Sequence, residues 1–483
     1  MGPRILNMDT LLSTGNYVGR KAVLEILEAG LQASDPYNNT FKLIRREGDK
    51  LIVGNRDFEP AGTPLSGDEV FDLSKIGRIF VFGAGKGIQR IAKALEDLLG
   101  DRLEGGHVID KKGHPIILKR IGVTLGSHPA PDADCVLGCQ RILEMTRDLT
   151  ENDLVFTLAG NGISSLLTMP APGLTIDEVS NVTRVMQIER GVPTPDLNPV
   201  RTHLDAMKGG KISRHIRPAK MVHLMGIEAR SYHHYMTGNS FIHTLPDYST
   251  FRTAIDNLKR WDAWDAVSPN VRRHLETADP AQETVKQAEF ETWGSRIYGL
   301  MPGRALPAAM KKAEELGFKS VLLADQMSNI EASQVGLVLA QIALTIEQKG
   351  QPFEPPVALF TDGELVVTVG QSNGVGGRHQ EMTLTAAQRI DGSENIVIGS
   401  VDADGTDGPG TQYTDGTLDI PCLAGGVVDG TTMDSARRLG INVVEHLKRH
   451  DTTPPMWKLS SGIIATPNIR VGDIIVALVT GRK

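Results

Sequence analysis

The chain has 483 residues, of which 40% are hydrophobic and 51 are glycine, a composition typical of globular proteins that bury a sizeable core. Its 51 Lys and Arg residues against 58 Asp and Glu residues give a net charge of −7, which disfavours nucleic acid as a partner. No apolar run approaches the roughly 18 residues of a membrane span, and the first residues lack a signal-peptide pattern. Three cysteines predict no disulfide framework, so we expect a cytoplasmic protein with neither membrane nor nucleic-acid partners.

At roughly 150 residues per domain, the length predicts two or three domains. Strand and helix patterns alternate along the chain, which predicts the α/β class. Apolar residues recur at helical spacing over 20–33, residues 78–82 have the composition of a buried strand, and a second amphipathic helix is expected over 88–99. Further strands are expected at 153–158, 221–227 and 320–324.

The stretch from 228 to 300 has a different character, because it holds ten of the 23 aromatic residues and shows no clean strand. We expect helical and irregular structure there, ending in a connection at 301–303. A division at this point predicts two domains, formed by residues 1–300 and residues 301–483.

Helices and strands alternate again in the last third of the chain. Helices are expected at about 306–316 and 333–349, the second ended by a glycine. Two strand-like runs, 357–361 and 364–369, flank Asp362-Gly363, which is the pattern of a tight β-hairpin. The remaining expected elements are a helix from Gly377, a strand over 396–400 and a strand over 473–479.

The first candidate site is the turn after the strand at 78–82, which carries Gly83, Gly85 and Lys86. Backbone N–H groups at a helix N-terminus bind anions, and a lysine there adds positive charge. A dinucleotide-binding turn is excluded because it needs glycine at the position of Ile88, and a P-loop is excluded because it needs glycine at position 80. The glycines could also serve only to let the helix pack on the strand, but Lys86 favours an anion site.

The second candidate site is a glycine-rich segment that ends in Gly376, Gly377, Arg378 and, one helical turn later, Glu381. The glycines allow the backbone to approach a ligand, and a guanidinium group at the first turn of a helix suits a phosphate or a carboxylate. The alternative is a flexible loop that carries a solvated arginine.

The third candidate site contains three carboxylates in six residues, Asp402, Asp404 and Asp407, after the strand at 396–400. Such a group can hold Mg²⁺, or one carboxylate can act as a base. Asp and Gly also fill ordinary turns, so this second interpretation stays open.

The fourth candidate site follows the strand at 153–158, at a strand end where ligands collect in open α/β sheets. Its candidate binding residues are Asn161, Gly162, Ser164 and Ser165. Downstream, Arg201 and Lys208 stand seven residues apart and would share one face of a helix, although either could be a solvated surface charge. Six of the 13 histidines fall between 203 and 243, but their spacing fits no zinc motif, and hydrogen-bonded or surface histidines are favoured.

Taken together, these segments resemble the glycerate 2-kinase family, whose C-terminal region is the MOFRL domain. The glycine–lysine loop at 79–86 resembles the first loop of that family. The Arg-x-His-Leu segment at 197–211 and the Gly-Gly-Arg segment at 362–381 also resemble family motifs in matching order. Further similar segments are 127–132, 405–408 and 424–429.

The resemblance implies an N-terminal Rossmann-like parallel sheet flanked by helices and a C-terminal α/β MOFRL domain with a mixed sheet, with a cleft between them. It implies that ATP, with Mg²⁺, phosphorylates the 2-hydroxyl of D-glycerate or a related acid. Lys86 and Arg378 take the catalytic positions, Asp407 is the candidate proton acceptor and Asp404 the candidate metal ligand. Physically this set is coherent, because phosphoryl transfer needs positioning and charge neutralisation above all.

The same resemblance gives the remaining substrate- or nucleotide-binding candidates: Gly83, Gly85, His128, Asn161, Gly162, Ser164, Ser165, Arg201, Lys208, Gly376, Gly377 and Glu381. The chain departs from the family pattern in the loops at 159–165, 225–231 and 465–468. These departures keep two alternatives open, an NAD(P)-dependent hydroxypyruvate reductase and a non-catalytic or differently specific relative. The sequence does not define the acid, the nucleotide preference or the number of subunits, so a homo-oligomer remains open.

Overall fold

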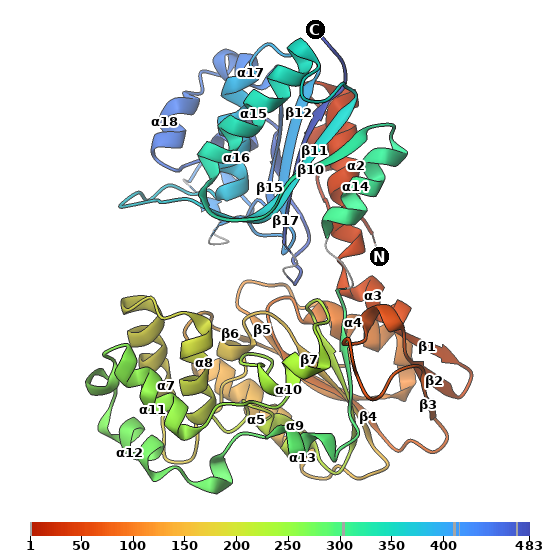
Figure 1. Ribbon diagram of the computed structural model, residues 1–483, viewed down its shortest axis with the longest axis vertical. Helices are drawn as coiled ribbons and strands as arrows, with labels where there is room; N and C mark the ends of the chain where they lie inside the picture. Colours follow the sequence, from red (N-terminus) through yellow and green to blue (C-terminus); the bar gives the residue numbers. More distant parts are fainter. Residues whose placement is uncertain (1, 302–304, 409–411, 415, 470–471) are drawn as a thin grey trace. The chain divides into compact units, whose positions relative to one another are not determined.

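The computed structural model describes residues 2–483 except 302–304, 409–411, 415 and 470–471 (Figure 1). The chain forms two compact units, Pro36–Pro302 and a second one that combines Met1–Asp35 with Gly303–Lys483. Both are α/β, as the sequence predicts. Among the described residues, no helix is long and apolar enough to cross a membrane.

The Pro36–Pro302 unit is built on a six-stranded sheet in which every neighbouring pair is parallel. The central strands β4 and β7 are buried along their whole length, because parallel sheets carry helices on both faces. In spatial order the strands are β6 (Gly122–Gly126), β5 (Leu103–Lys111), β4 (Ile79–Ala84), β7 (Leu154–Ala159), β8 (Lys220–Met225) and β9 (Arg296–Gly299). A small antiparallel sheet contains β1 (Ile44–Glu47), β2 (Lys50–Val53) and β3 (Glu69–Asp72).

Helices α4 and α5 of this unit pack beside the sheet, and several shorter helices follow later in the chain (Figure 1). They are α3 (Pro36–Leu43), α4 (Gln89–Leu99), α5 (Ala133–Thr146), α6 (Ile163–Leu166), α7 (Ile176–Thr183), α8 (Thr194–His203), α9 (Lys211–Ile216), α10 (Tyr232–Thr237), α11 (Phe251–Arg260), α12 (Pro269–Thr277) and α13 (Gln287–Glu291). The predicted strands at 78–82, 153–158 and 221–227 and the predicted helix at 88–99 are confirmed as β4, β7, β8 and α4. The expectation of no strand in 228–300 is wrong, because β9 forms there as a short edge strand.

The second unit contains a six-stranded mixed sheet, as predicted for the C-terminal domain. Only β10 and β11 pair in parallel, and the other neighbours are antiparallel. In spatial order the strands are β10 (Lys319–Glu331), β11 (Val357–Val366), β17 (Asp473–Val479), β12 (Ile396–Asp402), β15 (Gly425–Asp429) and β16 (Gly462–Ile463). A separate two-stranded sheet contains β13 (Tyr413–Thr414) and β14 (Asp419–Ile420).

The helices of the second unit cover this mixed sheet (Figure 1). They are α1 (Met8–Leu11), α2 (Tyr17–Ala33), α14 (Ala305–Glu315), α15 (Ala332–Lys349), α16 (Arg378–Arg389), α17 (Thr432–Arg438), α18 (Val443–Lys448) and α19 (Thr453–Lys458). The predicted helices at 20–33, 306–316, 333–349 and from 377 correspond to α2, α14, α15 and α16.

The N-terminal 35 residues belong to this second unit, which differs from the predicted division into 1–300 and 301–483. Val23 and Leu27 of α2 lie in the same apolar core as Val397 and Ile474 of the mixed sheet. A buried ion pair of 2.6 Å from the Arg20 Nε to an Asp429 carboxylate oxygen adds to this packing. Of the connection predicted at 301–303, residues 302 and 303 lie outside the described residues.

The hairpin predicted around Asp362-Gly363 is wrong, because β11 runs without a turn from Val357 to Val366. Gly363 pairs with Met327 of the neighbouring β10. A Cβ atom at this glycine would lie 1.9 Å from the Met327 carbonyl oxygen. The glycine therefore permits close approach of two strands instead of reversing the chain.

Candidate functional site

Two of the predicted glycine loops meet at the carboxyl ends of neighbouring strands β4 and β7. Gly85 has φ +151°, and a Cβ atom there would lie 2.5 Å from the Gly160 Cα. The Lys86 backbone N–H donates to the Asn161 carbonyl oxygen at 2.7 Å, and Lys86 is half-buried. Gly83 has a different role, because it lies inside β4 and a Cβ there would lie 2.1 Å from the Leu158 carbonyl oxygen. Strand pairing therefore brings the first and fourth candidate sites together.

A cavity of about 220 Å³ opens beside these loops. A Cβ atom at Gly162 would lie 3.2 Å from the Lys86 Cγ and 3.1 Å from the His128 Cδ2, so both side chains lie against this glycine of the lining. Six predicted binding residues line the cavity: His128, Asn161, Gly162, Ser164, Ser165 and Arg201. Of the other lining residues, Pro129 and Ile163 lie inside segments that the sequence analysis names, 127–132 and 159–165. Gln187, Thr194 and Phe241 were not identified, since they lie far apart in the chain and form no motif.

Arg201 carries a buried positive charge at this cavity and is only 6% exposed. Its guanidinium donates to the Gln187 amide oxygen at 2.8 Å, the Thr183 hydroxyl at 3.2 Å and the Asn198 amide oxygen at 3.4 Å, all of which are neutral. Burial lowers the pKa of Arg201 to about 10. Among the described residues, no carboxylate forms an ion pair with this guanidinium, so its charge is available to an anionic ligand.

The pKa of the His128 imidazole is lowered by burial and by the positive charges near this cavity. Burial, together with the charges of Lys86, Lys111 and Arg201, lowers the pKa of His128 to about 4. The ring is therefore neutral near pH 7. The cavity thus combines cations with neutral polar groups, an environment that attracts a small anion.

Lys208 lies elsewhere and is not available to a ligand. Helix α8 ends at His203, so Lys208 does not share a helical face with Arg201 as expected. Its ammonium group is fully buried, forms an ion pair of 2.6 Å with Asp205 and donates to the Thr168 hydroxyl at 2.8 Å. Lys208 is therefore a buried structural residue in the core of its unit.

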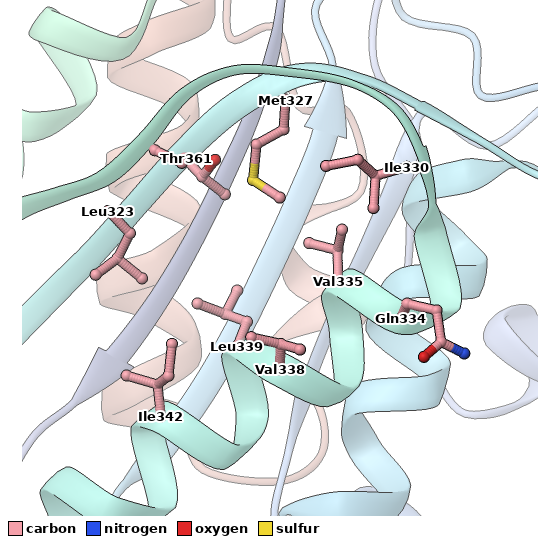
Figure 2. Close-up of a pocket in the computed structure, with 10 residues that line it drawn as sticks. Leu323, Met327, Ile330, Gln334, Val335, Val338, Leu339, Ile342 and Thr361 are labelled. Atoms are coloured by element: carbon pink, nitrogen blue, oxygen red, sulfur yellow. The ribbon is translucent and has the colours of Figure 1, made fainter.

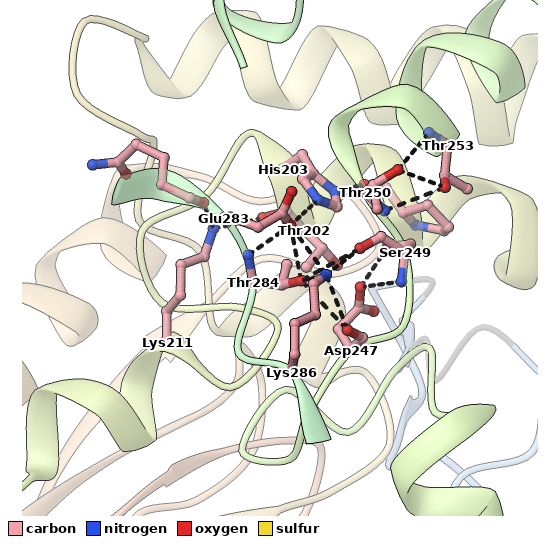
Figure 3. A network of polar contacts seen from close by, with 12 residues as sticks. Thr202, His203, Lys211, Asp247, Ser249, Thr250, Thr253, Glu283, Thr284 and Lys286 are labelled. Carbon is pink, nitrogen blue, oxygen red and sulfur yellow. Dashed lines mark hydrogen bonds and ion pairs between the residues drawn. The ribbon is translucent and has the colours of Figure 1, made fainter. Parts of the chain in front are cut away.

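A polar network fixes the C-terminal end of α8 and with it Arg201 (Figure 3). The His203 Nε2 lies 2.9 Å from a Glu283 carboxylate oxygen. The Lys211 ammonium donates to the Thr202 and Gln282 carbonyl oxygens at 3.0 Å each, where it satisfies the end of the helix. Lys286 ties the same cluster to the segment around Ser249 (Figure 3).

The second glycine-rich segment lines a cavity of about 420 Å³ in the other unit. The predicted residues among its lining are Gly376, Gly377, Arg378 and Glu381. The Glu381 carboxylate accepts a contact of 2.8 Å from the His450 Nδ1, and burial raises its pKa. The predicted grouping of these residues at the start of α16 is therefore present in the structure.

Arg378 differs from Arg201 because two carboxylates neutralise it. Its Nε donates to Asp473 at 2.8 Å, and its Nη2 donates to Asp473 at 3.0 Å and to Asp402. Burial opposes the charge of Arg378, but the Asp473 hydrogen bond and the two carboxylates outweigh burial and raise its pKa. Burial, followed by the charges of Asp404 and Asp473, raises the pKa of Asp402 to about 7.

Asp407 holds the N-terminus of α16. Its carboxylate accepts the backbone N–H groups of His379 at 3.1 Å and Gln380 at 2.9 Å, and the residue is 2% exposed. A Cβ atom at Gly377 would lie 2.2 Å from the Asp407 Cγ, so the glycine permits this contact. Each oxygen accepts one backbone N–H group at the start of the helix, and the role of Asp407 as proton acceptor stays a prediction.

The candidate metal ligand Asp404 is half-buried, and its carboxylate accepts from the Thr406 N–H at 2.9 Å and hydroxyl at 2.6 Å. In the described part of the chain, the three side chains close enough to share a metal ion are His379, Asp402 and Asp473. That set does not include Asp404. The two carboxylates in the set, Asp402 and Asp473, already form ion pairs with Arg378. It suits Mg²⁺ poorly, because Mg²⁺ prefers oxygen ligands in octahedral geometry.

A third cavity, of about 290 Å³, lies between β10 and α15 (Figure 2). Among the side chains that the structure describes, its lining contains Leu323, Met327, Ile330 and Val338 and no charged group (Figure 2). An apolar surface of this kind does not suit an anionic ligand, so the cationic cavity beside Lys86 is the candidate functional site.

Comparisons with known proteins agree with this description. Residues 22–276 match a domain of unknown function, DUF4147, and residues 357–469 match the MOFRL family. Glycerate 2-kinase of Pyrococcus horikoshii is 30% identical over 468 residues, which cover 96% of this chain and 98% of that protein. A protein of Agrobacterium vitis with the provisional name hydroxypyruvate reductase is 31% identical over 84% of this chain and its own full length. The crystal structure of glycerate kinase from Thermotoga maritima gives a TM-score of 0.71 at 28% identity and covers 95% of this chain and 99% of that chain.

The parallel sheet with its cationic cavity and the mixed sheet with its glycine-rich cavity define a two-unit α/β protein suited to small anionic ligands. The two family models match residues 22–276 and 357–469 in that order, and the Pyrococcus horikoshii relative aligns with 96% of the chain. The chain belongs to the glycerate 2-kinase family, in which a DUF4147 domain is followed by a MOFRL domain.

Proposed function

We propose that the protein transfers a phosphoryl group from ATP to the 2-hydroxyl of D-glycerate or a closely related hydroxy acid. The observation that carries this proposal is the buried Arg201 guanidinium, which lines a cavity of about 220 Å³ and contacts only neutral groups among the described residues. A carboxylate would supply the missing counter-charge through two parallel hydrogen bonds. The glycerate 2-kinase names of the relatives support the same ligand class.

The cavity favours the acid over the nucleotide as the ligand of Arg201. Its volume of about 220 Å³ suits a three-carbon acid and lies below the roughly 300–1,000 Å³ typical of sites for larger ligands. Lys86 lies against Gly162 of the same lining, and we assign to its ammonium group the neutralisation of charge on the transferred phosphoryl group. In this proposal Arg201 binds the acid and Lys86 is the catalytic cation.

The second unit contributes Arg378 and Asp404 to the proposal. The described hydrogen bonds of Arg378 engage Nε and Nη2, which leaves Nη1 to meet a phosphate oxygen at the edge of the 420 Å³ cavity. Mg²⁺, when bound with the nucleotide, would neutralise the phosphates, and Asp404 is the carboxylate proposed to hold it. We also propose that the protein is cytoplasmic and that its partners are small molecules, the acid and the nucleotide. The proposal does not fix the number of subunits.

The test is ADP formation with ATP, Mg²⁺ and a panel of C3–C6 hydroxy acids, with product mass and NMR identifying the phosphorylated carbon. Lys86→Met should lower kcat by about 10²–10³-fold, the range for removing one group that stabilises transition-state charge. Lys75→Met, at a lysine that is 81% exposed, is the matched control and should leave kcat unchanged. Equal activity of Lys86→Met and the wild type would refute the catalytic role of Lys86.

A reductase is the second candidate, favoured by the name of the Agrobacterium vitis relative. It would oxidise NADH or NADPH with hydroxypyruvate, yet Ile88 occupies the position where a dinucleotide-binding turn has glycine. NADH oxidation measured in the same preparation separates the two activities. Binding of an acid without either turnover would instead indicate a non-catalytic relative.

A further inference from the structure

Ser164 lies at the wall of the cationic cavity and contacts two buried side chains behind it. Its Oγ is 2.8 Å from the His243 Nε2 and 3.1 Å from the Asn198 Nδ2. His243 is 1% exposed and Asn198 is fully buried. These partners come from segments 79 and 34 residues away, so no sequence motif connects them.

The orientation of the Asn198 amide is set by its other contact. Its Oδ1 accepts from the Arg201 Nη1 at 3.4 Å, which directs its Nδ2 toward Ser164. The Ser164 oxygen therefore accepts a hydrogen bond from Asn198. The same asparagine links this hydroxyl to the guanidinium that we propose as the anion site.

Burial and the charges around His243 make its imidazole a weak base. Burial, followed by the charges of Lys208, Arg201 and Lys211, holds the pKa of His243 well below its usual range. Accepting a proton would place a fourth positive charge among these cations, which is unfavourable in a buried site. The pair therefore does not activate Ser164 as a nucleophile, and a neutral imidazole remains to share a hydrogen bond with the hydroxyl.

We propose that His243 is a positioning residue that, together with Asn198, holds the Ser164 hydroxyl as a hydrogen-bond donor to the carboxylate bound by Arg201. When His243 Nε2–H and Asn198 Nδ2–H both donate to the Ser164 oxygen, the hydroxyl proton has only the cavity to point into. An anion bound at Arg201 favours the His243 tautomer that carries its hydrogen on Nε2. In that tautomer the Ser164 hydroxyl adds a third hydrogen-bond donor to the two of the guanidinium. The inference rests on the proposed anion-binding function of this cavity.

The test measures D-glycerate binding without ATP by calorimetry, and KM and kcat separately, in Ser164→Ala, His243→Phe and His243→Gln. The first two should each weaken binding of the acid and raise its KM by about tenfold, with KM for ATP and kcat changed less than threefold. The double variant Ser164→Ala/His243→Phe should be no weaker than either single variant, because one donor is lost in each case. His243→Gln keeps an N–H donor at the Nε2 position and should recover most of the affinity.

Several outcomes would overturn this inference. His243→Phe and His243→Gln could both lower kcat with KM unchanged, which would make the imidazole a proton acceptor. Additive losses in the double variant, or a His243→Gln affinity as low as that of His243→Phe, would show a packing role alone. If His243→Phe does not fold, Ser164→Ala and Ser164→Ala/His243→Gln still decide the matter, since the glutamine should then cost nothing further.

Failure of the proposed function gives a different result. Arg201→Met should weaken calorimetric binding of D-glycerate on the order of 10- to 100-fold, whatever the role of His243. Binding that depends on Arg201 but not on Ser164 or His243 would leave the proposed function in place and overturn the inference. No binding of D-glycerate, other C3–C6 hydroxy acids or inorganic phosphate by the wild type would overturn both.

Discussion

Two buried arginines, one in each unit, show how the same side chain serves opposite purposes. Arg201 is 6% exposed and, within the described part of the chain, donates only to an amide, a hydroxyl and a second amide. Arg378 is 13% exposed and contacts two carboxylates, Asp402 and Asp473. Burying an unpaired charge is costly, so it persists where a ligand completes the pairing, whereas a paired guanidinium holds secondary structure together. The partners, more than the residue type, separate a guanidinium whose charge only a ligand would neutralise from one whose charge neighbouring carboxylates already neutralise.

The largest expected effect comes from Arg378→Met, which would leave the buried Asp402 and Asp473 without the guanidinium that pairs with both, although His379 would still lie 3.2 Å from Asp473. We expect a loss of about 3–5 kcal/mol in the free energy of unfolding of this unit, the range for breaking a buried ion pair from one side. Denaturant unfolding followed by near-UV circular dichroism measures it. Arg378→Met/Asp402→Asn should recover much of the loss, and an equal loss in both variants would show that charge pairing is not the cause.

Small anions should stabilise the Pro36–Pro302 unit, because they supply the counter-charge that Arg201 lacks among the described residues. D-glycerate at 100 times its Kd should add about 2.7 kcal/mol to the free energy of unfolding. Thermal unfolding with increasing ligand measures the effect. Glycerol is the matched neutral three-carbon control, and equal stabilisation by glycerol and D-glycerate would break the comparison between the two arginines.

Arg201→Met should separate binding from stability, the reverse of Arg378→Met. Binding of the acid should weaken on the order of 10- to 100-fold, equivalent to about 1.5–3 kcal/mol for a hydrogen bond to a charged group. The free energy of unfolding should change by no more than about 1 kcal/mol, because a desolvated charge is removed while three neutral partners lose a contact. Calorimetric titration and denaturant unfolding of one preparation measure both. A stability loss as large as that of Arg378→Met would indicate that Arg201 is also a structural residue.

Local patterns predicted many elements of this fold, and their failures have local physical reasons. The helices α2, α4 and α15 follow from apolar residues at helical spacing, and β4 and β7 from short apolar runs. The same spacing does not say which sheet a helix covers, so a division at residue 300 assigns α2 to the N-terminal domain, whereas the helix packs on the mixed sheet. Asp362-Gly363 has the composition of a turn, but Gly363 is required by the neighbouring Met327 backbone.

The part of the candidate site that lies in the loops at the ends of strands could be predicted from the sequence. The loops after β4 and β7 meet because the strands are adjacent and parallel, which places Gly85 beside Gly160. Arg201 was identified through a segment that resembles a family motif, whereas Lys208 in the same segment points into the core. His243 was hidden among the histidines of its region, since its partner Ser164 lies 79 residues away.

The smallest expected effect is a change in the pKa of His128, which reports the positive charge of the cavity that contains Arg201. Burial is the largest cause of the low pKa of His128, about 4, and the charge of Lys86 is the next. Lys86→Met should therefore raise this pKa while leaving it below the ordinary value of 6.5, and a bound anion should act in the same direction. Between pH 4 and 6.5 the folded protein holds fewer protons on His128 than the unfolded chain, so this residue lowers stability as the pH falls through that range. NMR titration of the His128 ring in the wild type and in Lys86→Met measures both effects, and an unchanged pKa would remove Lys86 from the positive field of the cavity.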